Sequence, residues 1–202
     1  MSETGISTKE RIASVAIELF AEKGYSETSM KDIASQVGIK VASIYNHYSA
    51  KEEILNTLLD EYFSAVGENI ISIDEITKLI DTTDSKSILN KMFCVFPPDM
   101  ADRYIKILKI VIHEQFREEK AKAFVRDIMF TYNEAYVKQV LDKLIDAGKI
   151  KTVDTGIYAK ILISLTISSS IEMLFYGLEE YQKMDKVSRR QATDFLLNQI
   201  LL

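Results

Sequence analysis

Apolar residues recur along this chain at the spacing of one helix face, and a short helix that ends at a glycine stands out among them. Four apolar residues follow an i, i+3, i+4, i+7 pattern that predicts a helix of about eight residues: Met30, Ile33, Ala34 and Val37. Gly38 follows the last of them directly, where a glycine can adopt the left-handed conformation that ends a helix. The pattern therefore predicts a helix and a tight turn.

A second helix is predicted after this turn, from about Lys40 to Tyr48. Ile44 and Tyr48 are four positions apart and can anchor its inner side, while Ile39 can fill the corner between the two helices. The remaining positions are polar, small or aromatic, which favours exposure to solvent. Two helices joined by a glycine turn, with the second one exposed, form the layout of a DNA-reading element.

The segment before these helices predicts the support that they need. A helix starting near Ser7 carries one apolar face, formed by Ile12, Val15, Ala16, Leu19 and Phe20. Three pairs of a serine and a carboxylate match or approximate the capping-box spacing: Ser7 with Glu10, Ser29 with Asp32, and Ser49 with Glu52. Three helices can therefore share one small core, and a fourth helix begins near residue 51.

The rest of the chain continues the helical periodicity. A long helix is predicted from Lys51 to about Ser72, and at 1.5 Å per residue it would extend about 30 Å. Pro97 and Pro98 mark a break. Further helices are expected over 74–82, 85–94, 99–117, 119–147, 154–182 and 188–201. We therefore expect an all-α protein with a helix-turn-helix head at 1–50, a connecting helix at 51–72 and a larger helical domain at 73–202.

The first 55 or so residues resemble the DNA-binding domain of the TetR family of one-component transcriptional regulators. The resemblance rests on joint spacing, because several features fall where that family has them: Thr8 to Phe20, Gly24-Tyr25, Thr28-Ser29, Ile33-Ala34, Gly38, Ile44-Tyr45, Tyr48 and Lys51-Glu52. It implies that the helix after Gly38 enters the major groove of DNA and that the helix before it crosses the backbone. The chain departs from the family pattern at Lys40, where a capping serine is common, and at Ser43, where glycine is frequent.

The resemblance also implies which residues contact DNA. Base selection would fall to the leading end of the second helix and one further position: Lys40, Val41, Ala42, Ser43 and Asn46. Other positions match those that the family uses mainly for phosphates: Ser29, Lys31, Tyr45, His47 and Lys51. Alternative roles remain open for two of these residues, because Ser29 can be only a helix cap and Lys51 only a solvated lysine.

Composition and charge limit the kinds of site and the cellular location that we expect for this protein. The chain has a net charge of −5, but the stretch 29–51 carries three lysines against one aspartate. We infer a narrow basic surface on an acidic protein, with weak nonspecific DNA affinity and a need for dimerisation. Cys94 is the only cysteine, which excludes an internal disulfide and the usual multi-cysteine zinc sites. The longest uncharged apolar run, Ile161 to Ile171, is too short to span a bilayer, so we expect a soluble cytoplasmic protein without a cofactor or membrane contact.

The larger helical domain is rich in methionine and aromatic residues, which usually form only a core. The resemblance implies in addition a small-molecule effector, and a mostly apolar cavity with a few polar anchors would suit a hydrophobic or amphipathic compound. The candidate pocket residues are Phe93, Phe96, Tyr104, His113, Phe116, Met129, Phe130, Asn133, Tyr136, Glu172, Met173 and Tyr176.

The last two predicted helices are candidates for a homodimer interface, as the family resemblance implies. Ser164 and Ser168 are four positions apart and small enough for two copies of the helix to approach closely. The candidate interface residues are Ile161, Ser164, Leu165, Ser168, Ile171, Phe195 and Leu196. A packing role within one chain is equally compatible with each of these residues taken singly.

Two other functional classes are less compatible with the sequence. An enzyme would need a catalytic set, but His113-Glu114 and Glu172 fit no HExxH motif, nucleophile elbow or metal-ligand pattern. A helical ligand-binding or adaptor protein that does not bind DNA is the main alternative, and the overall acidity favours it. We expect a transcriptional regulator of the repressor type, whose homodimer binds a near-palindromic double-stranded DNA operator and leaves it when the effector binds.

Overall fold

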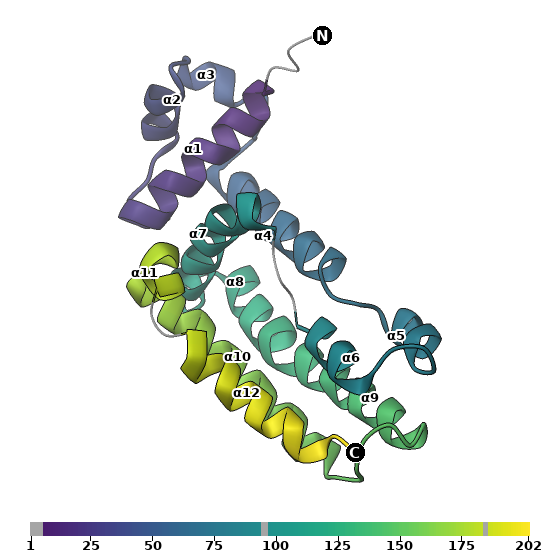
Figure 1. Cartoon of the computed structure of the whole chain (residues 1–202). Helices are drawn as coiled ribbons and strands as arrows, with labels where there is room; N and C mark the ends of the chain where they lie inside the picture. The colour runs from purple at the N-terminus through teal and green to yellow at the C-terminus, as the bar shows by residue number, and fades with distance from the viewer. Residues whose placement is uncertain (1–5, 94–96, 184–185) are drawn as a thin grey trace, which may run out of the picture. The chain divides into compact units, whose positions relative to one another are not determined.

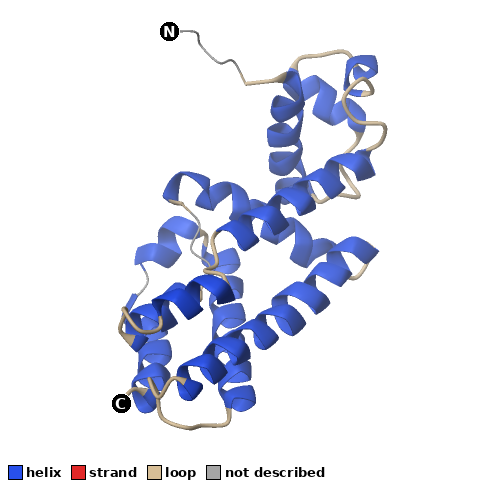
Figure 2. Cartoon of the chain, turned by 90° about the vertical axis from the view of Figure 1, so that its right-hand side faces the viewer, coloured by secondary structure: helices blue, strands red, loops and turns tan. Residues whose placement is uncertain are grey.

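The computed structural model of the chain describes residues 6–93, 97–183 and 186–202, which are predominantly helical (Figures 1 and 2). Within these ranges, the extended pairing consists of one isolated antiparallel bridge between Ile150 and Leu201. The prediction of an all-α fold is confirmed.

Contacts between residues divide the chain into two units, with the division inside α4 between Ala65 and Val66. The first unit holds α1 (Thr8–Lys23), α2 (Met30–Val37), α3 (Val41–Ile44), most of α4 (Lys51–Glu68), α7 (Pro98–Glu114) and α8 (Glu119–Ala123). The second unit holds α5 (Ile73–Leu79), α6 (Ser85–Lys91), the π-helix η1 (Phe124–Tyr132), α9 (Asn133–Asp146), α10 (Thr155–Tyr176), α11 (Leu178–Lys183) and α12 (Lys186–Ile200). The division into 1–50, 51–72 and 73–202 stays a prediction.

The first three helices share a core, because each presents an apolar face to the others. Ile12 on α1, Ile33 on α2 and Ile44 on α3 are completely buried. Phe20 packs edge-on against Tyr25, with 5.2 Å between ring centroids. Burial of a large aliphatic side chain contributes roughly 1.5–3 kcal/mol, so a small number of such contacts can hold three short helices together.

Local hydrogen bonds define where the helices of this unit begin. The capping boxes at Ser7 and Ser29 are both present, with the carboxylates of Glu10 and Asp32 accepting from the serine backbone amides. The third expected pairing is corrected by one residue. Ser49 donates from its backbone and hydroxyl to Glu53 at 2.6 Å and 2.7 Å, not to Glu52.

Ion pairs attach α7 to α1 and α4. Arg103 on α7 donates to both carboxylate oxygens of Glu61 on α4 at 2.5 Å and 2.6 Å, and to the Ser14 hydroxyl of α1 at 3.4 Å. Lys106 pairs with Glu18 of α1 at 2.8 Å. A bidentate pair between arginine and a carboxylate fixes orientation as well as distance, so α7 is fastened to two helices of its unit.

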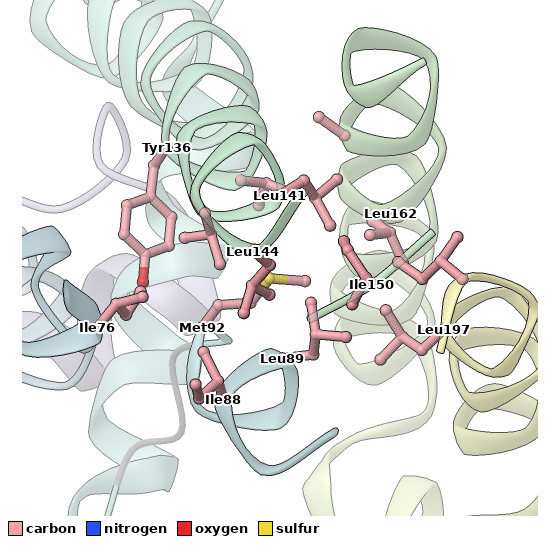
Figure 3. Packing of buried hydrophobic residues seen from close by; sticks show 14 of the residues in the cluster. Ile76, Ile88, Leu89, Met92, Tyr136, Leu141, Leu144, Ile150, Leu162 and Leu197 are labelled. Carbon is pink, nitrogen blue, oxygen red and sulfur yellow. The ribbon is translucent and has the colours of Figure 1, made fainter. Parts of the chain in front are cut away.

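The second unit has its own core, formed mainly by α5, α6, α9, α10 and α12. Figure 3 shows side chains from several segments converging there, among them Ile88, Leu144 and Leu197, all completely buried. Tyr136 lies at the edge of this cluster and donates its hydroxyl to the carbonyl of Ile71 at 2.7 Å. This partner satisfies the polar end of a side chain that is otherwise enclosed in apolar surroundings.

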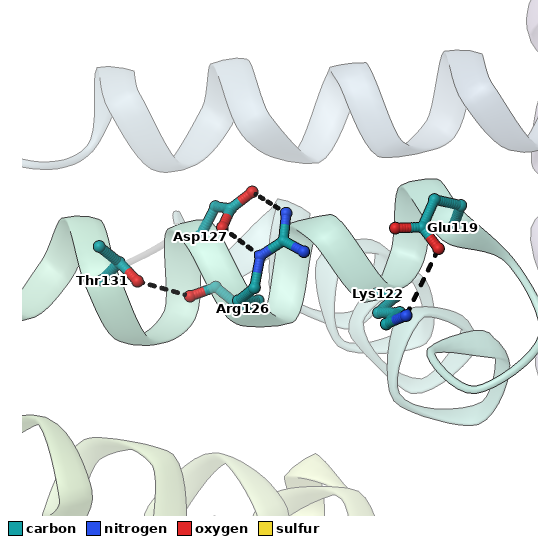
Figure 4. A network of polar contacts seen from close by, with 5 residues as sticks. All are labelled: Glu119, Lys122, Arg126, Asp127 and Thr131. Atoms are coloured by element: carbon teal, nitrogen blue, oxygen red, sulfur yellow. Dashed lines mark hydrogen bonds and ion pairs between the residues drawn. The ribbon is translucent and has the colours of Figure 1, made fainter.

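Two of the longer predicted helices are not continuous α-helices in the structure. The segment expected as one helix over 119–147 contains the π-helix η1, in which the Thr131 hydroxyl donates to the Arg126 carbonyl five residues earlier (Figure 4). The helix expected over 154–182 is interrupted at Gly177, which has φ of 76°. This left-handed conformation favours glycine and ends α10, and α11 starts at the next residue.

Candidate functional site

Residues on and beside α2 and α3 form an exposed surface in the first unit. Val41 is 36% exposed and Tyr45 is 52% exposed. The other exposed residues of this surface are Ser29, Lys31, Lys40, Ala42 and Asn46. Ser43 and His47 are half-buried. Most of the residues predicted to contact DNA are therefore accessible to solvent on neighbouring elements. We call these residues together the α2–α3 surface.

The inner side of α3 explains why this surface faces outward. Ile44 and Tyr48 are buried, and Tyr48 donates its hydroxyl towards the Lys9 carbonyl of α1 at 3.5 Å. Gly38 has φ of 78° and ends α2, with its amide donating to the carbonyls of Ala34 and Ser35. A side chain at Gly38 would be strained in this conformation, so the turn depends on glycine.

The α3 helix is shorter than predicted. It covers Val41–Ile44, and residues 45–47 form a turn in which the His47 amide donates to the Ile44 carbonyl at 2.8 Å. Lys40 precedes the helix and provides no side-chain cap, so one source of stability at a helix start is absent. The predicted helix over residues 40–48 is therefore corrected to one helical turn followed by a tighter turn.

Polar contacts set the position of α2. Arg11 of α1 donates to the Val37 carbonyl at the end of α2 at 2.8 Å. At the other end, the Ser29 hydroxyl accepts from the Asp32 amide. Hydrogen bonds from the Ser29 hydroxyl and backbone hold the pKa of Asp32 below its usual value. Ser29 therefore acts as a helix cap and is at the same time exposed beside Lys31.

Lys51 has a different environment from the one expected for a phosphate contact. Its ammonium donates to the carbonyls of Tyr25 at 2.6 Å, Thr28 at 2.8 Å and Ser26 at 3.4 Å, all in the loop between α1 and α2. An ammonium has three donors, and these carbonyls occupy them. This geometry favours an internal role for Lys51 over the predicted contact with DNA.

An open groove of about 520 Å³ lies in the second unit, between η1 and α10. Its lining is mostly apolar and aromatic with one carboxylate, and consists of Phe130, Ser164, Ile167, Ser168, Ile171, Glu172, Phe175 and Tyr176. The groove brings together three of the predicted effector residues, Phe130, Glu172 and Tyr176. It also contains three of the predicted dimer residues, Ser164, Ser168 and Ile171. Residues assigned to two functions from sequence therefore share one surface.

The other predicted effector residues are not brought to this groove. Tyr136 belongs to the core of the second unit, and Phe93 packs against that core. Burial, with smaller effects from Tyr132 and Glu75, raises the pKa of Tyr136 strongly, as expected for an enclosed phenol. Met129, Asn133 and Met173 are half-buried.

The remaining members of the predicted effector set lie elsewhere along the chain. Tyr104, His113 and Phe116 belong to the first unit, where Tyr104 is buried, His113 is exposed and Phe116 is 89% exposed. Phe96 lies outside the described residues. Sequence periodicity could not separate the two groups, because it does not show which helices pack together.

Helix α10 has an exposed stripe with heptad spacing, in which residues alternate at intervals of four and three. It consists of Ile157, Ile161, Ser164, Ser168, Ile171 and Phe175, with Phe175 82% exposed. Leu165 and Leu196 are half-buried, and Phe195 on α12 is exposed. The prediction missed Ile157 and Phe175, although the heptad interval in the sequence could have identified both.

The apolar character of α10 is also sufficient, by length and composition, for a membrane span. Only 22% of its most apolar window is buried inside the chain. A single helix of this kind is weak evidence for a membrane, since the core helix of a soluble protein meets the same criteria. Two serines in the exposed stripe and the regular heptad interval are typical of helix pairing.

Comparisons with known proteins identify the family. The family model described as "Bacterial regulatory proteins, tetR family" matches residues 12–58, which include most of α1 and all of α2 and α3. The negative transcriptional regulator IcaR of the biofilm operon icaADBC from Staphylococcus epidermidis is 31% identical over 131 residues, covering 64% of this chain and 68% of IcaR. IcaR from Staphylococcus aureus is 28% identical over 181 residues, covering 88% of this chain and 92% of the relative.

A solved structure agrees with this assignment at the level of the fold. A transcriptional regulator from Saccharomonospora viridis in complex with choline has a TM-score of 0.67 and 21% identity, and covers 96% of this chain and 97% of that chain. The IcaR relatives are negative transcriptional regulators. On the strength of the family match, the IcaR relatives and the shared fold, this chain belongs to the TetR family of bacterial transcriptional regulators, which bind DNA.

Proposed function

We propose that the chain is a cytoplasmic transcriptional repressor, which binds operator DNA as a homodimer and leaves it when a small effector binds. The observation that carries the proposal is the α2–α3 surface, where most of the residues expected to contact DNA are exposed around the turn at Gly38. The IcaR relatives, which are negative regulators, support repression over activation.

The proposed DNA contacts divide into two groups. Lys40, Val41, Ala42, Ser43 and Asn46 lie on or beside α3 and would meet base edges in the major groove. Their side chains include no arginine, and methyl groups with one hydroxyl, one amine and one amide read sequence only weakly. Deformability of the operator would therefore contribute to selection.

The second group would contact phosphates and fix the register of the protein on DNA. Ser29, Lys31, Tyr45 and His47 lie on both sides of the glycine turn, and Ser29 and Lys31 are at the start of α2. A helix N-terminus attracts anions because its free amides and its dipole point at the ligand. Mutation of these residues should weaken binding to all sequences alike.

We propose that the homodimer forms through the exposed stripe of α10 together with Phe195 and Leu196 of α12. The heptad interval suits two helices that cross at a small angle, and Ser164 and Ser168 in the middle allow a close approach. A second copy of the chain would cover apolar side chains that are otherwise in water, such as Ile161 and Phe175. Two copies of α3 about 34–36 Å apart would then meet successive major grooves.

The effector is proposed to be hydrophobic or amphipathic and to bind the second unit at the groove between η1 and α10. Phe130 and Tyr176 offer aromatic faces, and Glu172 is the one ionisable acid or base among the lining residues other than the tyrosine. The choline complex of the Saccharomonospora viridis regulator supports the idea that this fold accommodates small organic ligands. Because the groove shares residues with the α10 stripe, an effector there would act on the dimer interface directly.

Release from DNA requires that the effector bind the DNA-free form more tightly than the DNA-bound form. The coupling free energy in such systems is typically about 1–3 kcal/mol, and it must be the same for both binding events. A change in dimer geometry at α10 would alter the separation of the two α3 helices, which supplies the required difference between the two forms.

The decisive experiment selects duplexes from a randomised DNA library with the purified full-length protein. Repression of a palindromic operator predicts enrichment of a two-fold symmetric sequence, and binding in gel-shift assays should drop after Tyr45→Ala. A protein that enriches no sequence, at low salt as well as at physiological salt, would be an adaptor and not a regulator of this kind. Addition of a candidate effector should reduce binding to the selected duplex, and an unchanged affinity excludes that compound.

A further inference from the structure

Lys51, the first residue of α4, holds the loop between α1 and α2 through a single nitrogen atom. Its Nζ is 2.6 Å from the Tyr25 carbonyl oxygen, 2.8 Å from that of Thr28 and 3.4 Å from that of Ser26. The same Nζ lies 4.3 Å from the centroid of the Tyr25 ring. Three carbonyl oxygens and an aromatic face thus surround one ammonium.

The loop that Lys51 holds determines where α2 begins. Thr28 is 1% exposed, and its hydroxyl donates to the Gly24 carbonyl at 2.9 Å. The next residue, Ser29, is the N-cap of α2. A fixed Thr28 carbonyl therefore fixes the peptide that leads into the cap, and α2 in turn leads through Gly38 to α3.

The charges around this site oppose a phosphate. Burial raises the pKa of Tyr25 to about 12, and the negative charges of Glu118, Glu52 and Glu114 add to the effect. Glu114 is 2% exposed, and its Oε2 has no hydrogen-bond partner in the described part of the chain. A phosphate that approached Lys51 would meet this negative field and would have to displace a carbonyl from the ammonium.

We propose that Lys51 is a positioning residue for DNA binding, which fixes the start of α2 relative to α4 and does not itself contact a phosphate. This inference rests on the proposed DNA-binding function and replaces the expected role of one residue in it. Because Lys51 opens α4, movement of the first turn of α4 would pull on the three carbonyls of the loop that leads into Ser29. Lys51 is then the polar link through which α4 sets the presentation of α2 and α3.

The test compares Lys51→Met with Lys31→Met in the full-length protein, with the highest-affinity duplex that the wild-type protein selects from a random library. Lys31 is the matched control because it is exposed at α2 and is a proposed phosphate contact. Affinity is measured across a series of salt concentrations. Removal of one phosphate contact should reduce the slope of log affinity against log salt by about 0.9, so Lys31→Met should flatten the slope. Lys51→Met should weaken binding about tenfold or more with the slope unchanged.

A second variant, Lys51→Arg, separates the two roles more sharply. A guanidinium pairs with phosphate at least as well as an ammonium, so a phosphate contact would survive the change. Three carbonyls converging on one nitrogen cannot all be met by the donors of a planar guanidinium. We therefore expect Lys51→Arg to remain as defective as Lys51→Met to within about threefold.

Amide hydrogen exchange in the DNA-free protein reports on the position of the loop itself. In Lys51→Met, the amides of Asp32 and Ile33, which donate to Ser29, should exchange about tenfold faster, while those of α9 in the second unit stay unchanged. Unchanged exchange at α2, a flattened salt slope, or full affinity in Lys51→Arg would each overturn the role of Lys51. Unchanged affinity in a folded Lys51→Met protein would reduce that role to stability alone. A wild-type protein that selects no duplex would instead refute the proposed function.

Discussion

The three-helix head and the exposed stripe of α10 differ in how much of their apolar surface is buried within the chain. In the head, Ile12, Ile33 and Ile44 are completely buried, and polar groups at the starts of α1 and α2 have partners within the same unit. On α10, Ile161 and Ile171 are 40% and 39% exposed and Phe175 is 82% exposed. The head buries its large apolar side chains within its own unit, whereas α10 carries exposed apolar side chains that a second copy of the chain would cover. A core that is buried within one chain is suited to an element that contacts DNA. An apolar helix face that is left exposed is suited to an interface between two chains.

The largest effect is expected from a cavity in the head. Ile33→Ala removes a completely buried side chain and should lower the free energy of unfolding by about 2–5 kcal/mol. Ile157→Ala on α10, where the side chain is 58% exposed, should change it by less than about 0.5 kcal/mol when dimerisation is prevented. Urea unfolding of both variants in an Ile161→Glu background provides the comparison. Equal losses would show that the two surfaces do not differ in the way described.

The next effect concerns association of two chains. Ile161→Glu places a carboxylate on the α10 stripe, and in a dimer this charge would be buried without a partner. We expect the dimer dissociation constant to rise at least about a hundredfold, as measured by analytical ultracentrifugation. Lys160→Gln, one position away and off the stripe, is the control and should leave association unchanged. A dimer of wild-type affinity in Ile161→Glu would contradict the proposed interface.

A smaller effect is expected from the ion pair that attaches α7 to α4. Arg103 and Glu61 have side chains that are 26% and 29% exposed and form two hydrogen bonds. Arg103→Met should lower the free energy of unfolding by about 1–2 kcal/mol. Lys183→Met breaks an ion pair in which the Lys183 side chain is 65% exposed and that of Glu179 is 85% exposed. This change should lower the free energy of unfolding by no more than about 0.5 kcal/mol. Thermal melting of the two variants tests whether the ion pair between α7 and α4 in the first unit is the stronger one.

The smallest effect is a pH dependence in the head. Burial is the main reason that the pKa of Tyr25 is raised from 10.0 to about 12, so folding favours the neutral phenol. Its contribution to stability is complete below the unfolded pKa and is lost as the pH rises through the folded pKa. Tyr25→Phe should therefore show a shallower loss of stability between pH 10 and about pH 12, measured by urea unfolding. An unchanged pH dependence would indicate that Tyr25 does not ionise on unfolding in this range.

Local features of the sequence predicted the starts of α1 and α2 and the end of α2 in the first unit. Serine and carboxylate three positions apart predicted the caps at Ser7 and Ser29, and glycine after the last apolar residue predicted the end of α2. These features involve groups a few residues apart, so their geometry follows from the helix itself. The extent of α3 was predicted less well, because an uncapped start and the burial of Tyr48 decide where its hydrogen bonds tighten.

The candidate sites divide along the same line. The burial of Ile44 and Tyr48 follows from their four-residue interval, which the sequence contained. The exposure of Val41 and Tyr45 does not follow from it, because positions 41, 44, 45 and 48 share one face of a regular helix. The groove between η1 and α10 was only partly predicted, because periodicity separates a buried face from an exposed one but does not identify the neighbouring helix. Tyr136 illustrates the difference, since its hydroxyl is satisfied by the carbonyl of Ile71 in a distant segment.

The amino-acid sequence by itself determined the helical class, the glycine turn and most of the residues that α2 and α3 present to solvent. Only the tertiary structure decided that Lys51 donates to three carbonyls 23 to 26 positions away, that α7 belongs with the first unit, and that predicted effector and dimer residues share one groove. The physical reason is the separation along the chain between the groups that interact. Helix periodicity and capping depend on neighbours along the chain, whereas the partner of a long polar side chain is chosen by how separate helices pack.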